Sequence, residues 1–306
     1  MRRSSLVPEL APPLRLSYGS WVSREDFADA ALVLLGHGTT LNPGSAAPVF
    51  QHAAELRAGG CFAAVREAFW KQEPRLAGVL ASLGAPRVFI APLFISEGYF
   101  SERLIPRALG FRGLGQEGFC RARRQGGQTF FYCKPVGTHD AMTGALLARA
   151  REVMGQGPSS RGPALKKTTL FVAGHGTGRD PNSRRAIERQ AQLIRAMGLY
   201  ADAQGVFLEE EPRIVRCWEL AATRRLVVVP FFISEGLHVQ EDIPVMLGEA
   251  RRAVQRRLGQ GRPAWRNPTE RDGKLLWLSK SVGTQPDLAG VVLERVREAA
   301  SWTDGR

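Results

Sequence analysis

The sequence contains one set of motifs twice, in the same order, and this repetition limits what the chain can fold into. The segment FISEG begins at Phe94 and again at Phe232, which are 138 residues apart (232 − 94 = 138). The segment GHGT begins at Gly36 and again at Gly174, with the same spacing (174 − 36 = 138). Internal repeats of this kind predict structural units that share one fold. We therefore expect two related units joined in tandem.

A further pair of matching segments shows where the second copy is longer. The segment VGT begins at Val136 and again at Val282, so its spacing is 146 residues (282 − 136 = 146). The second copy therefore contains 8 extra residues (146 − 138 = 8), which follow Pro244. From these boundaries we predict an N-terminal extension over 1–28, a first lobe over 29–156, a linker over 157–167 and a second lobe over 168–306.

Short apolar segments typical of buried strands alternate with segments typical of helices in both copies. In the first copy, strands are expected at 31–35, 62–69, 87–94 and 129–134, and helices at 46–58, 73–83, 100–109 and 139–154. In the second copy, strands are expected at 168–173, 200–207, 225–232 and 274–280, and helices at 182–197, 211–222, 239–257 and 286–301. The segments 110–128 and 259–273 are expected to be loops. This alternation predicts, in each lobe, a parallel sheet with helices on both faces.

The chain is strongly basic, with a formal net charge of +13. Many of its arginines lie in two segments, 112–124 and 251–271. Three explanations are open: a solvated surface, binding of a small polyanionic ligand, or binding of nucleic acid. No nucleic-acid-binding motif with interleaved aromatic residues accompanies these arginines. Nucleic acid is therefore the least favoured partner.

The four cysteines are scattered and form no C-x-x-C pair, which is typical of reduced thiols in a cytoplasmic protein. The first 16 residues, MRRSSLVPELAPPLRL, are interrupted by Glu9 and three prolines. We expect neither a signal peptide nor a membrane-spanning helix.

Three residues that can bind metal occupy similar positions in the second copy. His175 follows the first strand, Glu209 closes the second, and His238 follows the third. Neighbouring parallel strands lie about 4.8 Å apart and end at one edge of the sheet, so these side chains are expected to converge. Two imidazoles and a carboxylate suit a divalent metal and leave positions open for substrate. Taken alone, a histidine after a strand is more often a hydrogen-bonded loop residue, and a run of glutamates is more often a solvated helix start. Glu210 or Glu211 is an alternative to Glu209 as the ligand.

Acidic residues near His238 are expected to support this site. Glu241 and Asp242 are placed to orient the imidazole, and Glu235 or Glu241 to relay protons. The sequence contains neither G-x-G-x-x-G after a strand nor G-x-x-x-x-G-K-[ST], so no dinucleotide or ATP is expected.

The first copy departs from this pattern. His37 is present, but we read Lys71 and Tyr99 at the places of Glu209 and His238, and Leu104 replaces the acid after them. One histidine with a lysine and a tyrosine is a poor metal site. The first lobe is therefore expected to shape or bind the substrate.

The motifs of the second copy resemble those of the class II chelatases, the sirohydrochlorin cobaltochelatase and ferrochelatase family. The similarity lies in GHGT at 174–177, FLE at 207–209 before EP at 211–212, and PFFxxxGxHxxxDIP at 230–244. It implies an internally duplicated form with two flavodoxin-like α/β lobes and a cleft between them. It also implies ATP-independent insertion of Co²⁺, Fe²⁺ or Ni²⁺ into a tetrapyrrole, as in cobalamin or sirohaem synthesis. The family's two metal-binding histidines correspond to His175 and His238, and its acidic partner to Glu209.

The resemblance also suggests which residues meet the carboxylates of a tetrapyrrole. The candidates are His37 and four arginines of the second copy, namely Arg179, Arg184, Arg213 and Arg216. Because one chain supplies both walls of a cleft, a monomer is expected. Two alternatives are open: a metal or tetrapyrrole carrier without turnover, and a polyanion binder that uses the arginine-rich segments.

Overall fold

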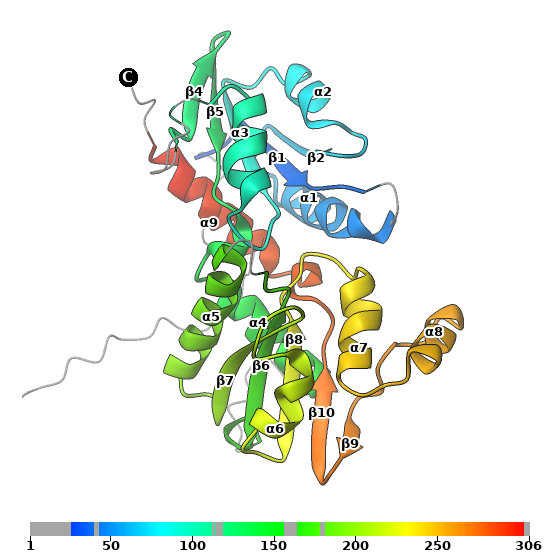
Figure 1. Ribbon diagram of the computed structural model, residues 1–306. Helices are drawn as coiled ribbons and strands as arrows, with labels where there is room; N and C mark the ends of the chain where they lie inside the picture. The colour runs from blue at the N-terminus through cyan, green and yellow to red at the C-terminus, as the bar shows by residue number, and fades with distance from the viewer. Residues whose placement is uncertain are drawn as a thin grey trace, which may run out of the picture.

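The structure, a computed structural model, describes residues 26–39, 43–111, 113, 119–155, 164–177 and 181–302. Its elements form two α/β lobes, each built around a five-stranded sheet (Figure 1). Residues 157–163 of the predicted linker and residues 1–25 of the predicted N-terminal extension lie outside the described residues.

The two sheets have the same strand order. The first runs β2-β1-β3-β5-β4 and the second runs β7-β6-β8-β10-β9. In each sheet the first four of these strands are parallel, and the last pairs antiparallel with its neighbour. The strands of the first sheet are β1 (Ala30–Gly36), β2 (Ala64–Phe69), β3 (Arg87–Pro92), β4 (Ala122–Gln125) and β5 (Gln128–Tyr132). Those of the second are β6 (Thr168–Gly174), β7 (Asp202–Phe207), β8 (Arg225–Pro230), β9 (Thr269–Arg271) and β10 (Lys274–Leu278).

The predicted parallel sheets are confirmed, but both segments expected to be loops contain an extra strand. β4 lies within 110–128 and β9 within 259–273. Each forms a hairpin with the strand after it, across Gly126-Gly127 and Asp272-Gly273. Such two-residue turns favour hairpins because glycine and aspartate adopt positive φ readily. The charged side chains on these edge strands hid them from a search for apolar runs.

The helices differ from the prediction mainly beside the carboxyl ends of the strands. The α-helices are α1 (Ala47–Gly59), α2 (Leu76–Ala81), α3 (Ile105–Ala108), α4 (Met142–Val153), α5 (Pro181–Ala196), α6 (Cys217–Leu220), α7 (Ile243–Met246), α8 (Arg251–Gly259) and α9 (Leu288–Ala300). The helix expected at 239–257 is instead a π-helical turn, η6 (His238–Asp242), followed by α7 and α8. Gly248, with φ of 112°, interrupts it. None of the described helices is long and apolar enough to cross a lipid bilayer.

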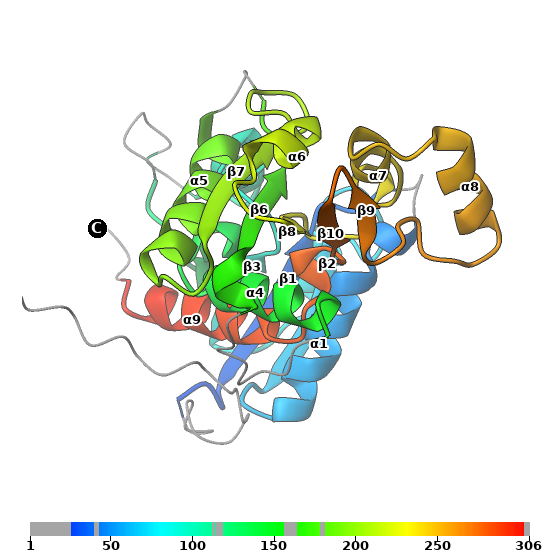
Figure 2. The same ribbon diagram turned by 90° about the horizontal axis from the view of Figure 1, so that it is seen from below.

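The two repeats exchange their last helices. Helix α4 ends the first repeat but packs against β8 and α5 of the second lobe. Helix α9 ends the second repeat but packs against β3, β5 and α1 of the first lobe. α4 and α9 also contact each other between the lobes (Figure 2). One apolar cluster therefore extends from Phe89 in the first sheet to Val229 in the second. The spatial lobes are not contiguous segments of sequence.

A buried arginine on each exchanged helix is bonded to the other repeat. Arg149 of α4 donates from Nε to the carbonyl of Ser281 (3.1 Å) and from Nη2 to Oγ1 of Thr284 (2.6 Å). Arg295 of α9 makes the equivalent bonds to the carbonyl of Pro135 (3.1 Å) and Oγ1 of Thr138 (2.7 Å). These bonds replace the water that each guanidinium loses on burial.

The carboxyl ends of the two sheets face each other. The chain leaves β5 through the 3-10 turn η3 (Val136–Thr138) and enters α4 in the second lobe. It leaves β10 through η7 (Val282–Thr284), where Nε2 of His52 in α1 lies 2.8 Å from the carbonyl oxygen of Gly283. Because parallel strands end at one edge, the ends of β1, β3, β6 and β8 also lie on the sides that face this junction.

We predict that Arg295→Met lowers the free energy of unfolding by about 2–4 kcal/mol, because a buried carbonyl and hydroxyl lose their donor. Chemical unfolding followed by circular dichroism measures the change. Arg252→Met, at an exposed position on α8, is the matched control and should change stability by less than about 0.5 kcal/mol. Equal stability of the two variants would contradict the role given to the exchanged helix.

Candidate metal centre at the edge of the second sheet

The first histidine of the candidate site is fixed by a tight turn at the end of β6. A Cβ on Gly174 would lie 2.1 Å from Cδ1 of Ile187, so any larger residue would have to displace this buried side chain of α5. Gly176 has φ of 62°, which returns the chain away from the sheet. Nδ1 of His175 lies 3.0 Å from the carbonyl oxygen of Gly176 and donates to it. This bond leaves Nε2 with its lone pair free.

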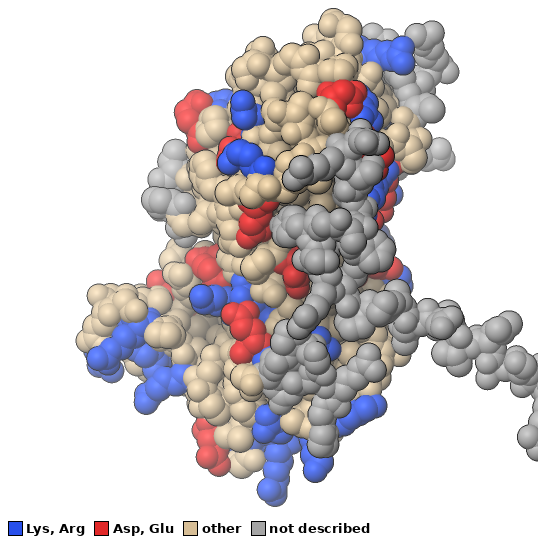
Figure 3. Space-filling model, turned by 180° about the vertical axis from the view of Figure 1, so that it is seen from behind, with Lys and Arg blue, Asp and Glu red and all other residues tan. Residues whose placement is uncertain are grey.

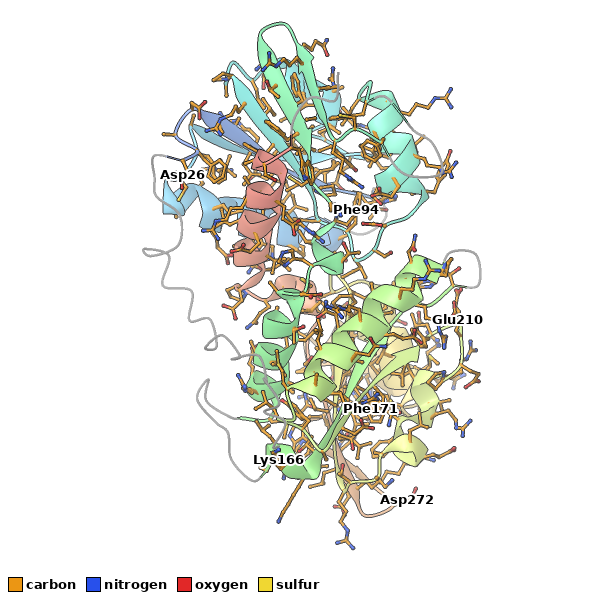
Figure 4. The ribbon with its side chains drawn as sticks, turned by 90° about the vertical axis from the view of Figure 1, so that its left-hand side faces the viewer. Asp26, Phe94, Lys166, Phe171, Glu210 and Asp272 are labelled. Carbon is orange, nitrogen blue, oxygen red and sulfur yellow. The ribbon has the colours of Figure 1, made fainter. Side chains whose placement is uncertain are left out.

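Glu209 lies beside this free nitrogen. Its backbone N–H donates to the carbonyl of His175 (3.1 Å), and its Oε1 is 3.8 Å from Nε2 of that histidine. Glu210 pairs with Arg184 at 2.8 Å, and the carboxylate of Glu211 accepts the backbone N–H of Arg213. Of the three consecutive glutamates, it is therefore Glu209 that faces the histidine. Figure 4 shows Glu210 on the side of its lobe that faces Phe94 of the first lobe.

The second histidine is placed by the π-helical turn η6. The ring centroids of His175 and His238 are 5.1 Å apart, and the planes are almost perpendicular at 84°. Nδ1 of His238 lies 2.8 Å from Oδ2 of Asp242 and donates to it. Nε2 is therefore the nitrogen left to bind a metal, as it is in His175.

Helix α8 supports this turn from outside. Arg251 donates to Oδ1 of Asp242 (3.2 Å) and to Glu241 (3.4 Å), and Gln255 donates to Glu241 (3.1 Å). Partial burial raises the pKa of Asp242, but the hydrogen bonds from His238 and Arg251 outweigh it and bring the pKa below its usual value. Asp242 therefore stays ionised and holds the histidine in one tautomer. Asp242 contacts His238 directly, whereas Glu241 is bonded to Arg251 and Gln255, and the orienting roles of both acids stay predictions.

The candidate ligands meet in pairs rather than as a closed set. His175 is close to both Glu209 and His238, but no group of three His, Cys, Asp or Glu side chains within the described ranges is close enough to hold a metal ion. The side chains of His175, Glu209 and His238 are 38%, 58% and 49% exposed. The three-ligand set therefore stays a prediction.

Several other predicted site residues have structural partners. Arg184 lies 4.5 Å from the Phe207 ring centroid and bonds to Glu188, Glu210 and the carbonyl of Glu211.

Two further candidates are also engaged. Arg216 pairs with Glu219 at 2.6 Å. Glu235 accepts the backbone N–H of Ser281 (2.6 Å), which attaches it to the segment after β10 rather than to His238. Arg213 is partly exposed, and Arg179 lies outside the described residues.

The first lobe repeats the backbone of the site with different side chains. His37 has its Nδ1 3.1 Å from the carbonyl oxygen of Gly38, as His175 does with Gly176. The residue in the place of His238 is Phe100, not Tyr99 as expected: its ring centroid lies 4.7 Å from that of His37, and it begins the matching π-helical turn η2 (Phe100–Leu104). The repeat spacing gives the same assignment (238 − 138 = 100).

Comparisons with known proteins agree with this architecture. The family model CbiX matches residues 31–153 and again residues 169–299. A probable sirohydrochlorin cobaltochelatase from Halobacterium salinarum is 40% identical over 281 residues, covering 89% of this chain and 92% of the relative.

Solved structures share the fold. A multi-domain protein from Deinococcus radiodurans with structural similarity to chelatases matches 89% of this chain with a TM-score of 0.69 and 29% identity; this chain spans 55% of that protein. SirB from Bacillus subtilis, solved with Fe³⁺, has a TM-score of 0.64 and 18% identity over 89% of this chain and 96% of its own.

The two related lobes, with paired histidines at the edge of one sheet, define a chelatase-type enzyme. The family model matches each repeat once, and the relative from Halobacterium salinarum matches 89% of the chain. The chain belongs to the CbiX family.

The reading of the sequence missed Arg251, although a signal was present. Arg251 lies in the longer part of the second copy, after Pro244, and α8 begins there. In the described part of the first lobe, no helix lies between α3 and β4, and Leu104 stands where Asp242 would be. The helix and the acid that support His238 therefore occur in the lobe that contains His238.

We predict that Asp242→Asn weakens Co²⁺ binding about 10–100-fold, because His238 loses the ionised partner that fixes its tautomer. Anaerobic Co²⁺ titration followed by the visible absorbance of the bound ion measures the change. Glu219→Gln, an exposed acid in the same lobe, is the control and should bind as the wild type does. Unchanged Co²⁺ affinity in Asp242→Asn would remove Asp242 from the site.

Proposed function

We propose that this chain inserts a divalent metal ion into a sirohydrochlorin-type tetrapyrrole, without a nucleotide, at the edge of its second sheet. The observation that carries the proposal is the pair of adjacent imidazoles whose Nδ1 atoms are both engaged, so that each presents Nε2 to a metal, with Nε2 of His175 lying 3.8 Å from Oε1 of Glu209. The relative named as a probable sirohydrochlorin cobaltochelatase supports the choice of substrate.

In this proposal the metal ion is a substrate that His175, His238 and Glu209 hold before it is transferred. The three side chains are half-exposed, so a ligand can reach the ion from the direction of the first lobe. Imidazole and carboxylate ligands accept Co²⁺, Fe²⁺ and Ni²⁺, and the open positions are available to the ring nitrogens. The absence of phosphate-binding motifs from the sequence supports a reaction without ATP.

Insertion replaces two ring protons with one divalent ion. Two pyrrole N–H bonds break, bonds from the ring nitrogens to the metal form, and the bonds from the metal to the protein are released. Each Nε2 or carboxylate oxygen that the metal leaves becomes a base that can accept one of the two protons. The Asp242 carboxylate then stabilises the protonated form of His238 through Nδ1.

The basic charge of the chain fits an anionic substrate. A net charge of +13 attracts a ring that carries several carboxylates and raises the rate of encounter. On the face shown in Figure 3, blue and red side chains are interspersed, with a group of basic side chains over α8. The mixture of charges on this face favours a small anion over a long nucleic acid, which needs a continuous basic path.

We predict that His175→Ala, His238→Ala and Glu209→Gln each lower kcat/KM for metal insertion by at least about 100-fold. Anaerobic insertion into sirohydrochlorin, followed by absorbance with Co²⁺, Fe²⁺ and Ni²⁺, measures the rates and ranks the metals. Glu219→Gln serves as the matched control.

Two outcomes would redirect the proposal. Tetrapyrrole binding by the wild type with no rate above the uncatalysed background would assign a carrier. Wild-type rates in the histidine variants would place the metal centre elsewhere in the chain.

A further inference from the structure

The first lobe retains the frame of the metal site but not its ligands. His37 follows β1, Lys71 follows β2, and Phe100 begins the turn after β3. The backbone N–H of Lys71 donates to the carbonyl of His37 (2.9 Å), as that of Glu209 donates to His175. The side chains of Lys71 and Glu209 therefore start from equivalent points at the edges of two sheets that face each other.

The different side chains of the first lobe reverse the charge at the position equivalent to Glu209. An ammonium stands in place of a carboxylate, and a phenyl ring replaces the second imidazole. Burial and the neighbouring charge of Lys71 lower the pKa of His37, so this imidazole is neutral at pH 7. The arrangement repels a cation and attracts an anion.

Lys71 is available to a ligand. Its side chain is exposed, and no carboxylate among the described residues lies within ion-pair distance of it. Its Nζ lies 5.3 Å from the centroid of the Phe100 ring, which holds the ammonium beside an aromatic face.

An exposed aromatic side chain borders the same point. Tyr99 is 64% exposed, and its ring centroid lies 6.0 Å from that of Phe100. The equivalent residue in the second lobe, Leu237 (237 − 99 = 138), is also 64% exposed. Each of the two facing edges thus presents one large apolar side chain beside its site.

We propose that the first-lobe site is a carboxylate-binding subsite, in which Lys71 binds a peripheral carboxylate of the tetrapyrrole while Tyr99 contacts the ring. The inference rests on the proposed function and adds a division of labour: the second lobe holds the metal, and the first lobe holds the macrocycle. A planar apolar ring with peripheral carboxylates matches a cation next to exposed aromatic surface.

The test compares Lys71→Met with Lys71→Arg, and with Lys166→Met as the matched control. Lys166 is exposed and lies at the far end of the second lobe (Figure 4). Two quantities are measured for each protein: the affinity for metal-free sirohydrochlorin by absorbance titration, and the steady-state kcat and KM for Co²⁺ insertion. Lys71→Met should raise both the dissociation constant and KM about tenfold, with kcat within about twofold of wild type.

The remaining variants should distinguish the effect of losing the Lys71 charge from an effect on the fold. Lys71→Arg should retain most of the affinity, Tyr99→Ala should weaken it, and Lys166→Met should leave it unchanged. Co²⁺ affinity measured without tetrapyrrole should be the same in Lys71→Met and wild type.

Failure of this inference is distinguishable from failure of the proposed function. Normal tetrapyrrole affinity and KM in Lys71→Met, in a protein that inserts metal, would overturn the subsite and leave the chelatase function standing. A fall in kcat alone, with KM unchanged, would also overturn it. A wild type that binds the tetrapyrrole but inserts no metal would refute the function, and the titration of Lys71→Met would still decide the subsite.

Discussion

The architecture depends on the exchange of the last helix between the two repeats. Because α4 covers the second sheet and α9 the first, neither core is complete without the other repeat. Arg149 and Arg295 bond to the turns after β10 and β5, the points at which each sheet approaches the junction. Removing two guanidinium groups from water is costly unless their donors are satisfied, so these bonds favour one arrangement of the lobes. That arrangement directs the carboxyl ends of both sheets toward each other.

The two repeats place different side chains on the same local backbone structure. In both lobes a histidine after the first strand is fixed through Nδ1 to the next carbonyl, and its Nε2 is left free. The second lobe adds Glu209 and His238, whereas the first lobe has Lys71 and Phe100 in the same places. The cationic side chain of Lys71 complements the proposed substrate, which carries carboxylates.

The support for His238 comes from a part of the chain that has no counterpart in the described residues of the first lobe. Helix α8 carries Arg251, which bonds to Asp242, which in turn bonds to the imidazole. The series of contacts from His238 to helix α8 is made of charge-assisted hydrogen bonds, which are directional and hold a half-exposed side chain in place. The longer part of the second copy and His238 are thus physically connected.

The sequence by itself determined the repeated fold, the parallel order of most strands, and the position of His175, Glu209 and His238 at strand ends, because motif spacing and apolar periodicity are local signals. Only the tertiary structure decided which sheet each last helix covers: the two sheets have similar faces, so an apolar helix face fits either. It also engaged Arg184 with Glu210 and Glu235 with Ser281. Such pairings join residues far apart in sequence, and local periodicity does not encode them.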